Sequence, residues 1–245
     1  MTSPARSTAE IIPVLDLMRG RVVRGIAGQR ESYQPITSRL ADSSDPLQIA
    51  DAFASQLGLD RIYLADLDAI ENNQPAWNEI ERLTGAGHRL MVDAGLRDVD
   101  RARDLVERGV ETVVAGLETV PGPGLVRELV QAVGNETLVF SLDLKQGVPM
   151  AHPGDWSEST PVEIADSVID AGVVRLIVLD LAGVGTGSGP PTLELCRRIR
   201  SRHVGIELIT GGGIRGSQDI SDATRAGADA VLVASALHDG SLLPD

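Results

Sequence analysis

The sequence predicts a closed (β/α)₈ barrel, the TIM-barrel fold, built from two similar half-barrels. Short apolar runs alternate with amphipathic segments along the chain, and motifs of the first half return in the second half. The length of 245 residues is also typical of this fold. Because only 2% of the residues are aromatic, the core has to be built mainly from Val, Ile, Leu and Ala. We expect a single barrel domain over residues 1–245.

Eight apolar runs predict the strands of the barrel, at residues 11–16, 61–66, 89–93, 112–116, 137–143, 174–180, 207–210 and 230–234. Amphipathic stretches between them predict helices, among them residues 46–57, 98–108, 161–171, 191–202 and 217–226. Asp45-Pro46 and Thr160-Pro161 each place a capping side chain before a proline, which is a typical helix start.

The chain after Ala236 is too short for a full eighth helix, so we expect that helix to be truncated. The N-terminal ten residues, or a second subunit of a homo-oligomer, would then have to cover that flank of the barrel.

Internal repetition favours the closed barrel over an open doubly wound sheet, which reverses its strand order and has no reason to repeat. The repeated segments are Leu15-Asp16-Leu17 with Gly20 and Leu142-Asp143-Leu144 with Gly147, and Ala94-Gly95-Leu96-Arg97 and Gly212-Gly213-Ile214-Arg215.

Composition excludes several classes of function. A net charge of −13 argues against nucleic acid as a partner, because phosphate backbones are bound by clustered Lys and Arg. The only cysteine, Cys196, rules out an intrachain disulfide and a cysteine metal cluster, and the four histidines lack ligand spacing. We therefore expect neither a metal nor a cofactor. No stretch is apolar enough for a leader or a membrane span, so we expect a cytoplasmic protein.

Two aspartates are the strongest candidates for catalysis. Asp16 and Asp143 end predicted strands one and five, which lie on opposite sides of a barrel mouth. Asp is unfavourable inside strands, so its presence there is explained by loop capping or by chemistry. An acid and a base on opposite sides of a substrate would suit proton transfer, and we therefore assign both residues catalytic roles.

A phosphate site is predicted at the loops after strands seven and eight, where barrels commonly hold phosphate. Glycines there let backbone N–H groups approach an anion. The candidate residues are Gly211, Gly212, Gly213, Ala234 and Ser235. Their first-half counterparts include Gly95 and Gly116, but Asp93 and Glu118 now flank that place. Because these carboxylates repel a phosphate, we expect one phosphate to bind, with the Asp93–Glu118 side empty or holding a cation.

Lys145 is the only lysine among 22 basic residues, and it follows Asp143 by two positions. A lysine, unlike an arginine, can form a Schiff base, so Lys145 is a third catalytic candidate. Holding a phosphate or a carboxylate is the alternative. Asp180 and Gly187, at the start of and within a glycine-rich segment after strand six, are further candidates for substrate binding.

Together these motifs resemble the histidine-biosynthesis barrel family, which contains a ribotide isomerase and its sister cyclase. The resemblance runs from residue 11 to about residue 240 and is carried by Ile12-Pro13-Val14-Leu15-Asp16-Leu17, Asp66-Leu67-Asp68-Ala69, Ser141-Leu142-Asp143, Gly187-Ser188-Gly189-Pro190 with Asp180, and Gly211-Gly212-Gly213-Ile214-Arg215.

The resemblance implies an Amadori-type aldose–ketose rearrangement of a phosphorylated aminosugar, with Asp16 as general base and Asp143 as general acid. The chain departs from the isomerase at Leu179, at Asp93-Ala94-Gly95 and at residues 152–156. At these positions the sequence more closely resembles a divergent branch of the family, which is found in organisms with methanopterin-type one-carbon metabolism. The alternative function is a Schiff-base lyase or synthase that uses Lys145 on a monophosphate in that metabolism.

Overall fold

The computed structural model describes residues 8–151, 156, 159–186 and 189–242. Within these ranges the parallel strands close into a barrel, because the last strand pairs with the first. In order around the barrel they are β1 (Glu10–Met18), β3 (Arg61–Asp66), β4 (Arg89–Asp93), β5 (Thr112–Gly116), β6 (Leu138–Lys145), β8 (Arg175–Asp180), β9 (Glu207–Gly211) and β10 (Ala230–Val233). The predicted (β/α)₈ fold is confirmed, and β3, β4 and β5 have the predicted bounds.

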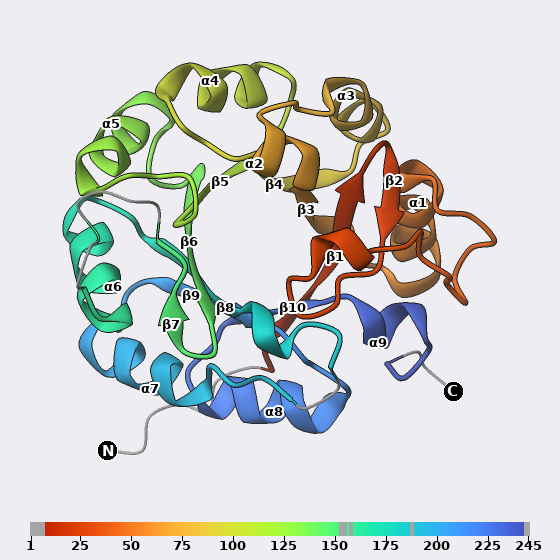
Figure 1. Ribbon diagram of the computed structural model, residues 1–245. Coiled ribbons are helices and arrows are strands. Elements are labelled where there is room, and N and C mark those ends of the chain that lie inside the picture. The colour runs from red at the N-terminus through yellow and green to blue at the C-terminus, as the bar shows by residue number, and fades with distance from the viewer. Residues whose placement is uncertain (1–7, 152–155, 157–158, 187–188, 243–245) are drawn as a thin grey trace.

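Helices surround the strands in a ring (Figure 1). They are α1 (Pro46–Leu57), α2 (Leu67–Asn72), α3 (Trp77–Gly85), α4 (Val99–Glu107), α5 (Pro123–Val133), α6 (Pro161–Asp170), α7 (Leu193–Arg202), α8 (Ser217–Arg225) and α9 (Ser235–His238). Both predicted caps form: the Asp45 carboxylate accepts from two N–H groups of α1, and Thr160 and Glu163 form a capping box at α6. No helix in the described ranges is long and apolar enough to span a membrane.

Strand alternation divides the core into two layers. Alternate residues of β3 show this, since Ile62 and Leu64 pack against the helices whereas Tyr63 and Ala65 point into the barrel. The inner layer consists mainly of aliphatic side chains, as the composition predicts. Tyr63 is the exception, and it carries a hydroxyl group into the barrel interior.

Two matching hairpins lie at the C-terminal ends of β1 and β6. Each strand turns back into a short antiparallel strand, β2 (Arg21–Val23) or β7 (Val148–Pro149). The turn residues Arg19 and Gly20 have φ of 51° and 71°, and Gln146 and Gly147 have φ of 55° and 76°. Positive φ at both central residues is the signature of a type I′ hairpin. The repeated Gly20 and Gly147 are thus explained by hairpins that the sequence analysis did not predict.

The truncated eighth helix is confirmed as α9, which has four residues. Ser38 and Arg39 of the same chain contact it: the Arg39 N–H donates to the His238 carbonyl at 2.8 Å, and the His238 ring lies 3.0 Å from the Ser38 hydroxyl. The centroids of the Phe53 and His238 rings lie 5.4 Å apart. Burial of the His238 ring lowers its pKa to about 4. Coverage of this flank by a second subunit stays a prediction, and residues 1–7 lie outside the described ranges.

The hairpins generate a stability test. We expect Gly20→Ala and Gly147→Ala each to lower the free energy of unfolding by about 1 kcal/mol, because an alanine at positive φ is strained. Neither glycine has an atom within 4 Å of an added Cβ, so the effect isolates the backbone.

Chemical denaturation with urea measures the change. Gly124→Ala is the control, because Gly124 lies in α5 with equally open surroundings and without positive φ, so alanine should be neutral or stabilising there. Equal effects at all three sites would contradict the hairpin interpretation.

Candidate active site

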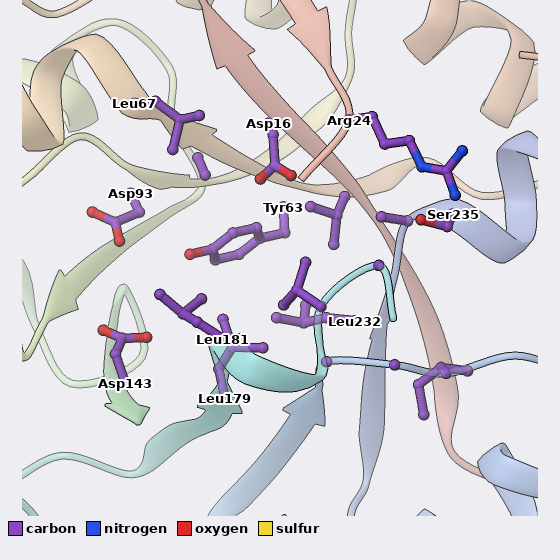
Figure 2. A pocket seen from close by; sticks show the side chains of 18 of the residues that line it. Asp16, Arg24, Tyr63, Leu67, Asp93, Asp143, Leu179, Leu181, Leu232 and Ser235 are labelled. Atoms are coloured by element: carbon purple, nitrogen blue, oxygen red, sulfur yellow. The ribbon is translucent and has the colours of Figure 1, made fainter. Parts of the chain in front are cut away.

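A cavity of about 230 Å³ lies at the C-terminal ends of the strands, where barrels position functional groups. Figure 2 shows its side chains arranged around Tyr63, with Asp93 and Asp143 on one side, Arg24 and Ser235 on the other, and Asp16 between them.

Asp16 lies in β1, between Ala65 of β3 and Val23 of β2 in the sheet register. Its carboxylate fills the space left by Gly25, where an added Cβ would lie 2.7 Å from Asp16 Oδ2. Burial raises the pKa of Asp16 to about 6, and the positive charge of Arg30 partly opposes this. Asp16 is therefore mostly ionised at neutral pH, as a general base should be.

Asp143 lies in β6, across the barrel from β1, and is 7% exposed. Burial raises its pKa well above the usual range, and the negative charges of Glu118 and Asp93 add to this. The Ser141 hydroxyl donates to Asp143 Oδ1 at 2.7 Å, which opposes the shift without reversing it. The environment of Asp143 therefore favours its protonated form, which is the form that a general acid needs.

Asp93 at the end of β4 is a second buried carboxyl group next to Asp143, whereas Asp16 is half-buried. Gly116 separates the two: a Cβ added there would lie 3.3 Å from Asp93 Oδ2 and 3.5 Å from Asp143 Oδ2. Burial raises the pKa of Asp93 to about 7, although the Gly95 N–H donates to its Oδ1 at 3.0 Å. The predicted substrate residues Gly95 and Gly116 thus both contact acidic groups.

Tyr63 was missed by the sequence analysis. It is 5% exposed, and its ring projects toward the region between Asp93 and Asp143 (Figure 2). Burial raises its pKa well above the usual value, and the nearby negative charges of Asp93 and Asp143 add to this. Its hydroxyl makes no hydrogen bond with any other residue that the structure describes. Strand alternation, which places residue 63 on the face opposite Ile62 and Leu64, was the signal that could have found it.

Two arginines from the segment after β2 were also missed. Arg30 reaches over the barrel mouth and donates to both Glu118 carboxylate oxygens at 3.2 Å and to Glu71 of α2 at 3.3 Å. Arg24 lies on the opposite side, next to Ser235 (Figure 2), and its guanidinium contacts no carboxylate of a described residue. No local motif marks either arginine, because their neighbours in space are distant in the chain.

The predicted phosphate residues come together at the Arg24 side of the cavity. Gly212, Gly213, Ala234 and Ser235 line it, and Gly211 ends β9 directly before them. Gly213 has φ of 94°, and an added Cβ would lie 2.7 Å from the Gly189 carbonyl oxygen. The N–H groups of Gly213 and Ser235 donate to no acceptor within the described ranges. This turn therefore offers backbone donors to an anion.

The equivalent turn in the first half is closed. The N–H of Gly95 is taken by Asp93, and the Arg97 guanidinium fills the adjoining space by donating to the carbonyls of Ala69, Ile70 and Gly95. Arg215, the counterpart of Arg97, is instead held by Asp219 of α8. The two turns share a sequence pattern but differ in what their backbone groups bind.

The remaining predicted residues lie apart from the carboxyl groups. Asp180 accepts from the N–H groups of Gln146, Gly147 and Ala182, so it ties the β6–β7 hairpin to the segment after β8. Lys145 is exposed at the end of β6 and does not line the cavity. Gly187 lies outside the described residues. Within the described ranges, no three His, Cys, Asp or Glu residues are grouped as a metal site.

The fold and the cavity define a (β/α)₈-barrel protein with acid–base groups at the C-terminal ends of its strands. The family model described as "Histidine biosynthesis protein" matches residues 10–243, so the chain belongs to this family.

Several relatives cover nearly the whole chain. It is 32% identical to the imidazole glycerol phosphate synthase subunit HisF of Leifsonia xyli subsp. xyli, over 95% of this chain and 91% of that protein. It is 31% identical to an uncharacterized protein of Methanocaldococcus jannaschii, over 95% of each. It is also 31% identical to the 1-(5-phosphoribosyl)-5-((5-phosphoribosylamino)methylideneamino) imidazole-4-carboxamide isomerase of Methanosarcina barkeri, over 94% and 93% of the two chains.

Buried carboxyl groups with raised pKa values make stability depend on pH. In the folded protein Asp93 keeps its proton up to about pH 7, whereas in the unfolded chain it ionises near 3.8. The folded state therefore binds more protons between these values, and the free energy of unfolding falls as pH rises through this range. We expect Asp93→Asn to reduce the fall between pH 5 and pH 8 by about 2–3 kcal/mol.

Urea denaturation at both pH values measures this difference. Asp100→Asn, which removes an exposed carboxyl group from α4, controls for the loss of one negative charge. A wild-type-like pH dependence in Asp93→Asn would contradict the burial argument.

Proposed function

We propose that the protein is an aldose–ketose isomerase that carries out an Amadori-type rearrangement of a phosphorylated aminosugar. The observation that carries this proposal is the pair Asp16 and Asp143, which come from opposite strands of the barrel and line one cavity. Burial raises the pKa of Asp16 only to about 6 but that of Asp143 well above its usual range, which suits one base and one acid.

The proposed chemistry moves three protons through two side chains and needs no other reactant. Asp143 donates its proton to the ring oxygen of the aminosugar, and the ring opens to an iminium ion. The Asp16 carboxylate removes the proton at C2, which gives an enolamine, and then returns this proton to C1. The C2 hydroxyl proton goes back to Asp143 as the ketone forms. Both side chains regain their starting states, as an isomerisation requires.

Phosphate binding supports the same proposal. The free N–H groups of Gly213 and Ser235, with the Arg24 guanidinium beside them, would hold a phosphate at one side of the cavity. That side adjoins β9 and β10, while the acid and the base lie further along the cavity wall. A substrate anchored there by its phosphate would extend toward Asp16 and Asp143.

The histidine pathway is the first assay, because the M. barkeri relative is named an isomerase of the phosphoribosyl imidazole carboxamide. The gene should be tested for rescue of a histidine auxotroph that lacks the isomerase, scored beside the authentic enzyme. Rescue would assign the substrate. If the protein is soluble and folded but does not rescue growth, its substrate would be a different phosphorylated aminosugar.

We expect Asp16→Asn and Asp143→Asn each to lower turnover by about 10²–10⁴-fold, because each removes one proton-transfer group. The fold should stay intact, since Asn has nearly the same shape. Asp66→Asn is the control: Asp66 also ends a strand, but it caps α2 and does not line the cavity. Thermal unfolding and single-turnover rates should be measured together. Near-wild-type turnover in either active-site variant would exclude that residue from proton transfer.

The Schiff-base alternative depends on Lys145, whose exposed position outside the cavity wall gives it no support. We expect Lys145→Arg to keep most of the activity, because an arginine preserves the charge but is not a nucleophile. Borohydride reduction in the presence of a phosphorylated aldehyde, followed by mass analysis, checks this directly. A reduced adduct mapped to Lys145 would overturn the isomerase proposal in favour of a lyase or synthase.

A further inference from the structure

We propose that the acidic side of the cavity binds a protonated amine, so that the substrate is a phosphate monoester with a cationic group at its far end. This inference rests on the proposed function for the phosphate side. It differs from what the name of the M. barkeri relative implies, since that name contains two phosphoribosyl groups.

The acidic side has lost the means to bind an anion. In the phosphate turn, Gly211 and Ala236 occupy the positions that Asp93 and Glu118 occupy in the first half. These two changes bring carboxylates to the place of a second phosphate, and Asp93 also consumes the Gly95 N–H at 3.0 Å. A phosphate there would meet carboxylates rather than open donors.

Arg30 is the guanidinium that lines this side among the described residues, and it is already bound to carboxylates. Arg30 shares its guanidinium between Glu118, at 3.2 Å to both oxygens, and Glu71, at 3.3 Å. Asp93 and Asp143 lie further in and have no cationic partner within hydrogen-bond distance among the described residues. Because the pKa of Asp93 is about 7, this carboxyl group is partly ionised at neutral pH, and a ligand cation next to it would favour its ionised form.

Tyr63 gives an independent indication of a ligand. Its side chain is 95% buried, since its exposed fraction is 5%, and its hydroxyl points into the acidic side without a hydrogen-bond partner among the described residues. Because Tyr63 lines the cavity, this hydroxyl is open to a ligand bound there and can accept a hydrogen bond from it. A protonated amine has three donors, which could serve Asp93, Asp143 and the Tyr63 oxygen together.

The cavity is thus polarised along its length. Figure 2 shows Arg24 near Ser235 at one side and Asp93 and Asp143 at the other. Arg215 also lines the cavity, but Asp219 binds its guanidinium. Asp239 also lines the Arg24 side, but its carboxylate accepts from the Ser241 N–H and hydroxyl. A volume of about 230 Å³ lies below the roughly 300–1,000 Å³ typical of pockets for drug-sized ligands. Both features suit a small zwitterion better than a bisphosphate.

Matched probes test the inference by calorimetric titration. A series of ω-aminoalkyl phosphates, from two to six carbons, is compared with the hydroxyalkyl phosphates of the same lengths and with inorganic phosphate. At the best chain length we expect the aminoalkyl phosphate to bind about 10–100-fold more tightly than the hydroxyalkyl phosphate of the same length. This difference is what one charge-assisted hydrogen bond typically contributes. A binding enthalpy that varies with buffer at pH 7 is also expected, because a bound cation expels the Asp93 proton.

Two variants test which carboxylates cause the preference for the amino probe. In Asp93→Asn/Glu118→Gln the amino preference should disappear, and an alkyl bisphosphate should gain affinity as Arg30 is released. Glu71→Gln is the control, because it also removes a carboxylate from Arg30 but does not line the cavity, so the preference should persist. Unchanged affinity for inorganic phosphate and an unchanged unfolding temperature show that the double variant is folded.

The outcomes are distinguishable. Equal binding of amino and hydroxy probes, or tighter binding of the bisphosphate by the wild type, would overturn this inference and leave the isomerase proposal standing. Binding that requires added Mg²⁺ would replace the amine by a metal ion and overturn it as well. If neither inorganic phosphate nor any probe binds, the proposed phosphate site is contradicted, and both proposals are overturned because both depend on it.

Discussion

The burial of several carboxyl groups in one cavity is the constraint on which the rest of the site depends. Closure of the barrel brings the ends of β1, β4 and β6 around a single mouth, so Asp16, Asp93 and Asp143 lose water together. Desolvation raises each pKa, but neighbouring charges separate them, since Arg30 stabilises the Asp16 carboxylate whereas Glu118 and Asp93 disfavour ionisation of Asp143. The same residue type can therefore serve as base and as acid.

The two half-barrels show how one backbone pattern can hold opposite electrostatics. Matching type I′ turns follow β1 and β6, and matching glycine turns follow β4 and β9. In the second half the Gly213 N–H stays open, while in the first half the corresponding Gly95 N–H is capped by Asp93. Asp93 and Glu118, which stand at the positions of Gly211 and Ala236, therefore give the two matching turns opposite electrostatics within the same fold.

The sequence predicted the fold well because its signals are local. Apolar runs, caps and repeats depend on neighbours in the chain, and they located the strands, the truncated α9 and both facing aspartates. Tyr63 could have been predicted from strand alternation, but Arg24 and Arg30 could not, because they reach the cavity from a long irregular segment. Asp180 and Lys145 lie at strand ends, as Asp16 and Asp143 do, so the sequence pattern does not distinguish them. Only the hydrogen bonds from the Gln146 and Gly147 N–H groups show that Asp180 holds the hairpin backbone.

These buried groups also connect stability with ligand binding. Burial raises the pKa of Asp93 to about 7, so ionisation of this carboxyl group above that pH lowers the free energy of unfolding. A ligand cation next to Asp93 would favour the ionised carboxylate and offset part of this loss. Desolvation likewise raises the pKa values of Asp16 and Asp143, the residues of the proposed proton transfer, so the burial that lowers stability is also what would tune these groups for the reaction.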